Sequence, residues 1–600
     1  MTATEHIDPV SSSPAPPPGP RAPGPLRRHP VLATTALAAV LHVAWFFLFA
    51  NSGGDLAAQD AWAEFVGRHP DSAYNLAWYG GMHPVSYSVV SPYVMSLLGV
   101  RTTMMLAGTA SAALLTLVLC RCRGAVRDPL PPALAGVFAL LCNALSGRVT
   151  FGLGLMFALG AVAAVFCWPR KWMRRRWGKA AVAAPLAGLA TAASPVAGLF
   201  LGLVAAALFL SGRRPGAYAV GLPPVVVVGL SAWLFPFSGT QPLSVGSASL
   251  PFLFGVLVLL LVPREWTTVR VAAGVYAAGV LLCWLVDSQI GSNVTRFAML
   301  FAGVVLLAAV PYTVPRTRRR YALLAAFLGL NAWISVNSVS DIVRTTPKAA
   351  WARELAPLVD RLQKAGAERG RVEVVPVSSH RESSAMARYV NLARGWNRQA
   401  DLERNPLFYD DTLDGDNYRE WLDRWAVHYV VLPQDPPDSG GKDEAALIRA
   451  GLPYLKQVWA DENWHLYEVT APTPLADPPA TVRRADAGEL VVDVKAAGRV
   501  LIRIPYSPWL GLVDERGKGV EPPRETDASK ARDGDPREFV NVAGCLLRAP
   551  EDGAGDEWTV LLAPAPGEYR LAAPYQLPRG TACPEELAGP APRPEPAPGS

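Results

Sequence analysis

Residues 51–91, NSGGDLAAQDAWAEFVGRHPDSAYNLAWYGGMHPVSYSVVS, form a long polar and aromatic stretch directly after the first apolar run of the chain. The stretch carries an early carboxylate, Asp55, which follows two glycines and precedes a helix-like segment. Most other polar residues that could carry chemistry fall on the same predicted side of a membrane as this stretch. The functional interpretation therefore depends on how the spans around residues 51–91 are counted.

The composition indicates a membrane protein. The 600 residues are 51% hydrophobic and only 18% charged, which is too apolar for a soluble multidomain protein of this length. The apolar residues are concentrated before Asn337, whereas the remainder resembles a soluble protein. Basic and aromatic residues are not interleaved as in nucleic-acid-binding proteins, so no nucleic-acid partner is predicted. We expect a membrane domain followed by a soluble region.

Apolar runs of about 15 to 21 residues predict about eleven membrane helices. Segment 86–100, SYSVVSPYVMSLLGV, is ambiguous, because counting it as a span would reverse the side of everything downstream. If it does not cross, the most basic loops and the N-terminus all face the cytoplasm, as the positive-inside rule requires. We therefore predict an interfacial or re-entrant helix at 86–100, within a first outer loop over residues 52–101. The predicted spans lie near residues 31–51, 102–120, 130–145, 149–168, 179–193, 195–211, 216–235, 246–263, 268–286, 294–311 and 320–337.

The predicted fold is a polytopic α-helical membrane domain followed by two extracytoplasmic units. Helix-like and buried-strand patterns predict an α/β region, and short alternating runs between Gly, Pro and Asp turns then predict a β-sandwich. The protein is expected in the cell membrane, with its N-terminus cytoplasmic and no cleavable signal peptide. The predicted boundaries are a disordered Pro-rich tail over 1–26, the membrane domain over 27–340, the α/β region over 341–475, the β-sandwich-like region over 476–588 and a disordered tail over 589–600.

Asp55 has two interpretations. It is the preferred candidate for a general base, but Asp is also a common helix N-cap, because its carboxylate accepts from first-turn N–H groups. Asp60 and Glu64 are spaced i, i+4 and would share a helix face, where an acidic solvated surface is the simpler interpretation. The Tyr79 to His83 segment indicates a turn with interfacial aromatics, and a phosphate or sugar contact by His83 is the alternative.

Arg148 and Arg296 are predicted at the outer ends of spans, where a charge is costly unless it is paired or bound to an anionic headgroup. Two such arginines could hold a lipid phosphate through forked hydrogen bonds. Snorkelling toward water is the alternative explanation. The residues predicted to bind substrate on the outer face are His83, Arg148, Arg296, Tyr79, Gln241 and Asn293.

The soluble region contributes two further candidates. Residues 393–411, ARGWNRQADLERNPLFYDD, combine aromatic and polar side chains that suit sugar recognition, although a polar loop packed on the membrane domain is an equal alternative. Of the seven cysteines, Cys545 and Cys583 lie in this region and would face an oxidising compartment, so we expect a disulfide between them. No zinc-type spacing is present, and a requirement for a divalent metal stays open.

In these features the chain resembles the GT-C type polytopic membrane glycosyltransferases of the actinobacterial kind. The resemblance rests on many helices, a large first outer loop with an early acid in GGDLAAQ, and a C-terminal outer domain. The sequence departs from the family in having no Asp-X-Asp pair in this loop. The resemblance implies membrane lipids as surroundings, a polyprenyl-phosphate-linked sugar as donor and a cell-envelope glycan as acceptor.

The same resemblance implies roles for individual residues. Asp55 would accept the proton of the acceptor hydroxyl, and Arg148 and Arg296, with His83, would stabilise the charge on the leaving lipid phosphate. Two other functions compete. A multi-pass transporter would have charged residues at mid-span, and we find almost none there. In a non-catalytic envelope assembly protein Asp55 would be only a helix cap.

Overall fold

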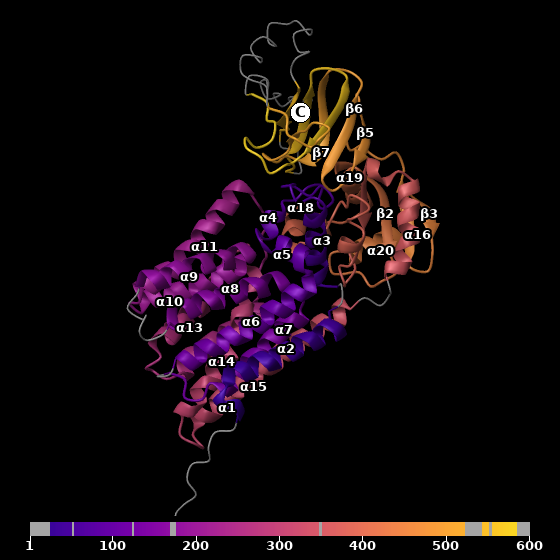
Figure 1. The fold of residues 1–600 in the computed structure, drawn as a ribbon. Coiled ribbons are helices and arrows are strands. Elements are labelled where there is room, and N and C mark those ends of the chain that lie inside the picture. Colours follow the sequence, from indigo (N-terminus) through magenta and orange to yellow (C-terminus); the bar gives the residue numbers. More distant parts are fainter. Residues whose placement is uncertain are drawn as a thin grey trace, which may run out of the picture.

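The computed structural model describes residues 25–50, 53–122, 125–168, 176–346, 351–521, 543–550 and 555–584. A helical domain carries an α/β region and a β-rich region at one of its ends (Figure 1). The two segments predicted to be disordered, 1–26 and 589–600, lie outside the described residues, apart from the backbone of residues 25 and 26. The boundaries predicted between the domains stay a proposal.

Each apolar run predicted from the sequence is helical, because a helix satisfies its own backbone hydrogen bonds where water is absent. In the described part of the chain, 7 helices are long and apolar enough to cross a membrane. The number that cross stays a prediction. The helices of this domain are α1 (Pro25–Arg28), α2 (Pro30–Leu48), α6 (Val100–Arg121), α7 (Leu130–Leu145), α8 (Val149–Phe166), α9 (Arg176–Ala193), α10 (Pro195–Leu210), α11 (Arg214–Leu234), α12 (Val245–Leu261), α13 (Thr267–Leu285), η2 (Gly291–Val294), α14 (Thr295–Ala309), η3 (Val310–Tyr312) and α15 (Arg318–Thr345).

The long loop between α2 and α6 is packed rather than solvated. It contains α3 (Asp55–Arg68), α4 (Pro84–Tyr87) and α5 (Ser91–Leu98). Eight residues of α5 extend over only about 12 Å, too short to cross a bilayer, which agrees with a non-spanning segment at 86–100. Hydroxyl groups of Ser88 and Ser91 donate to the carbonyls of Ala192 and Ala193, at the turn between α9 and α10. These bonds fix the loop on the helical domain.

The α/β region packs its sheet directly on this loop. Trp62 and Trp78 of the loop are fully buried in one apolar cluster with Leu358, Val372 and Leu466. Strands β1 and β2 are parallel, and the other pairs of the four-stranded sheet, ordered β1-β2-β4-β3, are antiparallel. The elements are α16 (Trp351–Lys364), η4 (Ala367–Arg369), β1 (Arg371–Val374), α17 (Glu382–Ala385), α18 (Arg398–Arg404), η5 (Pro406–Phe408), α19 (Gly415–Arg424), β2 (Val427–Pro433), α20 (Lys442–Ala450), β3 (Leu455–Ala460) and β4 (Trp464–Val469).

The β-rich region consists of two sheets, ordered β7-β10-β9 and β5-β6-β11-β8. Alternate residues of β6 and β7, among them Val492 and Ile502, are buried in one cluster that both sheets share, because side chains i and i+2 face the same side of a strand. The strands are β5 (Ala480–Ala485), β6 (Glu489–Val494), β7 (Gly498–Pro505), β8 (Gly511–Leu512), β9 (Cys545–Arg548), β10 (Trp558–Ala563) and β11 (Gly567–Ala572).

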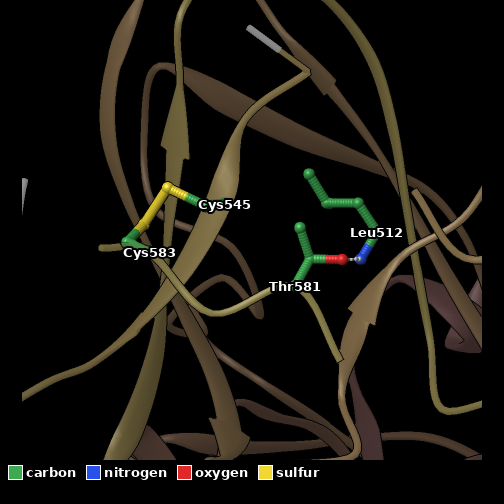
Figure 2. The surroundings of a disulfide bond; sticks show 4 residues. All are labelled: Leu512, Cys545, Thr581 and Cys583. Atoms are coloured by element: carbon green, nitrogen blue, oxygen red, sulfur yellow. Dashed lines mark hydrogen bonds between the residues drawn. A yellow bond between two sulfur atoms is a disulfide. The ribbon is translucent and has the colours of Figure 1, made fainter. Parts of the chain in front are cut away.

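A disulfide joins Cys545, at the start of β9, to Cys583 near the end of the described chain (Figure 2). These are the two cysteines paired in the sequence analysis. Beside the disulfide, the Leu512 N–H donates to the hydroxyl of Thr581 at 3.0 Å, which ties β8 to the same segment. The covalent bond and the hydrogen bond together attach residues 581–583 to both sheets.

Candidate active site

A cavity of about 390 Å³ lies where the helical domain meets the α/β region. The helical domain contributes the start of α3, the turn between α7 and α8, and the end of α15. The α/β region closes the other side with Ser378, His380, Trp396, Arg398, Asp438 and Ser439. The chain therefore builds this cavity from segments that are far apart in sequence.

Asp55 is the first residue of α3 and lines the cavity, with 39% of its side chain exposed. The two preceding residues are glycines because the backbone passes close to Thr345 and Ser379 at this point. A Cβ at Gly53 would lie 1.9 Å from the carbonyl oxygen of Thr345, and Gly54 has a φ of 62° while its N–H donates to Ser379 O at 2.7 Å. Gly54 occupies the N-cap position of α3, and among the described residues no side-chain cap hydrogen bond is formed at this end. Asp55 is therefore the first residue of the helix rather than its N-cap in this structure.

The structure brings Arg148 and Arg296 to Asp55. The distance from Asp55 Oδ2 is 3.6 Å to Arg148 Nε and 4.0 Å to Arg296 Nη2. Arg148 is the residue before α8, and Arg296 is the second residue of α14, so both side chains reach inward from the same end of the helices. The Nε atom of Arg148 is buried and has no hydrogen-bond partner in the described chain. One carboxylate thus faces two guanidinium groups whose hydrogen-bonding capacity is not saturated.

Asp341 is a fourth charged member of this cluster, which sequence reasoning missed. Its Oδ2 lies 3.6 Å from Arg148 Nη2 and accepts a hydrogen bond from Ser146 Oγ at 2.8 Å. The signal available in the sequence was that Asp341 is the one acid within α15. From the sequence, this position was predicted only as the start of the α/β region. Two carboxylates and two guanidinium groups make the cluster balanced in charge.

Gln59 is a second residue that sequence reasoning missed, and it fixes the geometry of the cluster. Its buried amide donates to the carbonyl oxygen of Asp55 at 2.7 Å and to that of Gly147. Its side-chain oxygen accepts from the N–H of Thr150 at 2.7 Å and from the Thr150 hydroxyl at 3.2 Å. The helix that carries Asp55 is therefore tied through one side chain to the segment that carries Arg148.

Tyr87 stands beside the cluster as a neutral phenol. Burial raises the pKa of Tyr87, and the negative charge of Asp55 raises it further, while a hydrogen bond with Thr150 acts in the opposite direction. A protonated phenol can donate a hydrogen bond but adds no charge. The charge balance of the cluster is thus set by the arginines and the carboxylates.

The α/β region supplies an aromatic and polar wall. The rings of His380 and Trp396 are stacked with centroids 3.4 Å apart and an interplanar angle of 9°. Arg398 Nη2 lies 2.7 Å from Asp438 Oδ2, and Arg398 also donates to the hydroxyl of Tyr409 at 2.6 Å. Trp396 and Arg398 belong to the 393–411 stretch, which therefore reaches the cavity, and Gln399 of the same stretch donates to Gln289 O of the helical domain at 2.6 Å.

Other residues of the 393–411 stretch lie behind this wall. Arg394 is buried against the carboxylates of Asp401, Glu373 and Glu444. Burial raises the pKa of Glu444 to about 7 and that of Glu373 well above its ordinary value. This cluster belongs to the core of the α/β region, since none of its members lines the cavity.

Two predicted substrate-binding residues have structural roles instead. His83 Nδ1 lies 2.7 Å from Ala73 O and its Nε2 lies 3.2 Å from Ser507 Oγ, so this ring joins the first loop to the β-rich region. Burial lowers the pKa of His83 to about 4. The Tyr79 side chain is completely buried, and its hydroxyl donates to Gly395 O at 2.9 Å. The Tyr79 to His83 segment, predicted as a turn with interfacial aromatics, is covered by the α/β and β-rich regions.

Gln241 and Asn293 form a hydrogen bond with each other and do not line the cavity. The amide of Asn293 donates to Gln241 Oε1 at 3.3 Å, and the amide of Gln241 donates to Ser292 Oγ at 2.9 Å. Asp60 and Glu64 are likewise occupied, because Asp60 forms an ion pair with Arg101 and Glu64 with Arg388. None of these four residues lines the cavity that contains Asp55.

No set of three or more His, Cys, Asp or Glu side chains is arranged to hold a metal ion among the residues that the structure describes. Asp55 and Asp341 approach the same arginine, so each carboxylate is compensated by a guanidinium group.

Residues 477–588, which cover the β-rich region, match a family model described as Domain of unknown function (DUF8823). No curated protein matches the chain. In structure the chain is similar to the arabinofuranosyltransferase AftD from Mycobacteria, at 14% identity and a TM-score of 0.42, over 78% of this chain and 41% of that one. It is also similar to the oligosaccharyltransferase of Archaeoglobus fulgidus, at 10% identity and a TM-score of 0.43, over 90% of this chain and 88% of that one.

The chain spans less than half of the length of AftD. Both of these proteins are glycosyltransferases. This is also the class of enzyme that the sequence resembles.

Proposed function

We propose that this protein is a membrane glycosyltransferase that moves a sugar from a polyprenyl-phosphate donor to a glycan acceptor of the cell envelope. The observation that carries the proposal is the position of Asp55, which lines a cavity at the end of the membrane helices together with Arg148 and lies 4.0 Å from Arg296 behind it. The volume of about 390 Å³ lies within the range of roughly 300–1,000 Å³ of small-molecule sites. It can take a sugar together with a phosphate.

The arginines are the proposed phosphate site. Arg148 and Arg296 contact Asp55 at 3.6 and 4.0 Å, longer than hydrogen bonds, so a phosphate can replace the carboxylate as their partner. The lipid tail of the donor would remain among the membrane helices. Binding of the phosphate would then release Asp55 from the arginines at the moment when a proton acceptor is needed.

Asp55 is the proposed general base. The acceptor hydroxyl oxygen would form a bond to the anomeric carbon while the bond from that carbon to the phosphate oxygen breaks. Asp55 would take the hydroxyl proton, and Arg148 and Arg296 would stabilise the negative charge that develops on the leaving phosphate. Asp341 would hold Arg148 from its other side, at 3.6 Å.

The location of the charges supports this function over transport. Arg148 directly precedes α8, Arg296 is the second residue of α14, and Asp341 lies in the last turns of α15. All three are at the cavity end of their helices, whereas a transport pathway requires polar groups near mid-membrane. Gly54 at the N-cap position of α3 weighs against the non-catalytic alternative, in which Asp55 is only a helix cap.

The proposal includes a membrane topology. The N-terminus would lie in the cytoplasm, and the cavity, the α/β region and the β-sandwich-like region would lie on the outer side, where the disulfide between Cys545 and Cys583 is stable. The domain boundaries would be those given in the sequence analysis.

The test is a transfer assay on the purified full chain in detergent. The donors would be a panel of tritium-labelled farnesyl-phospho-sugars, and the acceptor would be a soluble extract of envelope glycan. We expect transfer with at least one donor, and a loss of about 10²-fold or more in the Asp55→Asn variant. The matched control is Asp60→Asn on the same helix, which should keep wild-type turnover.

Thermal unfolding would show whether the Asp55→Asn and Asp60→Asn variants are folded. If they are, equal turnover in Asp55→Asn and wild type would rule out Asp55 as the general base. Failure of every donor in the panel with wild-type protein would count against the enzyme class itself.

A further inference from the structure

A second cavity, of about 370 Å³, opens at the start of α13. Its lining consists of Leu259 from α12, Arg264 from the connecting turn, and Thr267, Arg270, Val271 and Gly274 from α13. Because the end of α13 leads through η2 into the start of α14, where Arg296 lies, the start of α13 is at the opposite end of the helical domain from Asp55. This groove is therefore independent of the candidate active site.

The two arginines of this groove differ from other arginines at the same end. Arg127 stands over the ring of Tyr312 at 4.2 Å and donates to Pro311 O, and Arg319 donates twice to the last carbonyl of α12, Leu261 O. Within the described chain, the side chains of Arg264 and Arg270 form no hydrogen bond, ion pair or ring contact with another protein group. Two guanidinium groups at one groove are thus left for an external anion.

The rest of the groove is apolar. Leu259 and Val271 form its sides, and a Cβ placed on Gly274 would meet no atom within 4 Å, so the space beside this glycine is open. Gly274 follows Arg270 by four residues, a rise of about 6 Å along the helix toward the middle of the membrane. The surface of the groove is therefore apolar, and its two arginines belong to the connecting turn and the first turn of α13, at the end of the helical domain.

We propose that this groove binds an anionic phospholipid. Arg264 and Arg270, with the Thr267 hydroxyl, would hold the headgroup phosphate, and one acyl chain would lie along Val271 and Gly274. The two positive charges without protein partners match an anionic headgroup, and basic pockets between membrane helices on the cytoplasmic side are known to take such lipids. By the predicted topology, α13 begins on that side. The proposed lipid binding does not depend on whether the protein transfers a sugar.

The test is native mass spectrometry of the full chain in detergent, with added dioleoyl phosphatidylglycerol or dioleoyl phosphatidylcholine. Wild type should bind one phosphatidylglycerol molecule at least about tenfold more tightly than phosphatidylcholine, the gain that charge-assisted hydrogen bonds provide. The Arg264→Ala/Arg270→Ala double variant should lose this preference. The Arg213→Ala/Arg214→Ala pair removes the same charge at the start of α11, outside the groove, and should keep it.

A second variant tests the apolar surface of the groove without touching the arginines. Gly274→Leu should fill the open space and weaken phosphatidylglycerol binding by a similar factor, and it should not unfold the helix, because Leu has the higher helix propensity. Absence of the lipid preference in wild type would overturn the proposal, and so would its persistence in both groove variants or its equal loss in Arg213→Ala/Arg214→Ala. Competition by free glycerol 3-phosphate as strong as by the lipid would show a simple phosphate site and would also overturn it.

Discussion

Replacement of Gln59 by leucine tests whether the alignment of Asp55 with Arg148 matters for the reaction. The side chain is 1% exposed and lies between α3 and the start of α8, with no contact to the cavity itself. Leucine has a similar volume but can neither donate nor accept a hydrogen bond. The substitution therefore removes the polar link between the two segments while leaving every charged residue of the site in place.

The magnitude follows from the group that loses its partner. Without Gln59, the N–H of Thr150 loses its partner in a buried environment, whereas the carbonyl of Gly147 keeps the N–H of Val149 at 3.0 Å. An unsatisfied buried group costs about 1–3 kcal/mol, so we expect a loss of that size in the free energy of unfolding. A displacement of about 1 Å between reacting groups lowers a rate by roughly 100-fold, and we expect turnover of the folded variant to fall by that factor.

The assay measures transfer per folded molecule together with the midpoint temperature of unfolding. Asn391→Leu is the matched control, since Asn391 is also buried and its amide donates to Ala485 O at 3.1 Å, outside the cavity lining. This control should lose stability and keep turnover. If Gln59→Leu kept wild-type turnover, or if Asn391→Leu lost as much turnover, the positioning role of Gln59 would be refuted.

Three further predictions concern other parts of the molecule. Asp341→Asn should lower transfer by about tenfold or more through loss of the second carboxylate beside Arg148, with a smaller effect on donor affinity than Arg148→Ala, as measured by steady-state kinetics. Cys545→Ser should lower the unfolding midpoint of the β-rich region, because the disulfide closes a loop with a sequence separation of 38 and such loops contribute roughly 3–4 kcal/mol; reduction of wild type should reproduce the effect. The pKa of Glu444 is raised from 4.5 to about 7, so the folded state binds this proton more tightly than the unfolded state. Its contribution to stability should be present below pH 4.5 and lost as the pH rises through about 7, and Glu444→Gln should flatten this part of the melting-temperature profile.

The sequence predicted the helices well, because a bilayer imposes both their length and their apolar character. It also predicted that Asp55, Arg148 and Arg296 would lie at one end of the helical domain, since the distribution of basic loops assigns them to the same side. The sequence could not predict that the Asp55 carboxylate lies 3.6 Å from Arg148 and 4.0 Å from Arg296. Those distances depend on how α3 is seated on α8 and α14.

The misassigned residues have a common cause. Tyr79 and His83 lie in a stretch that reads as a polar loop, but the α/β and β-rich regions bury it, and this cover comes from parts of the chain hundreds of residues away. Gln59 and Asp341 were missed for the converse reason. Each looks like an ordinary polar residue on a helix, and only the packing of that helix against its neighbours brings it to the site.

The most direct test of the central claim is the position of a donor phosphate. An electron cryo-microscopy structure of the full chain with a non-transferable polyprenyl-phosphonate sugar analogue would show it. We expect the phosphonate within hydrogen-bond distance of Arg148 and Arg296, with the anomeric carbon beside Asp55 in the cavity at the α/β region. A phosphonate held elsewhere, with the ion pairs of Asp55 intact, would contradict the account.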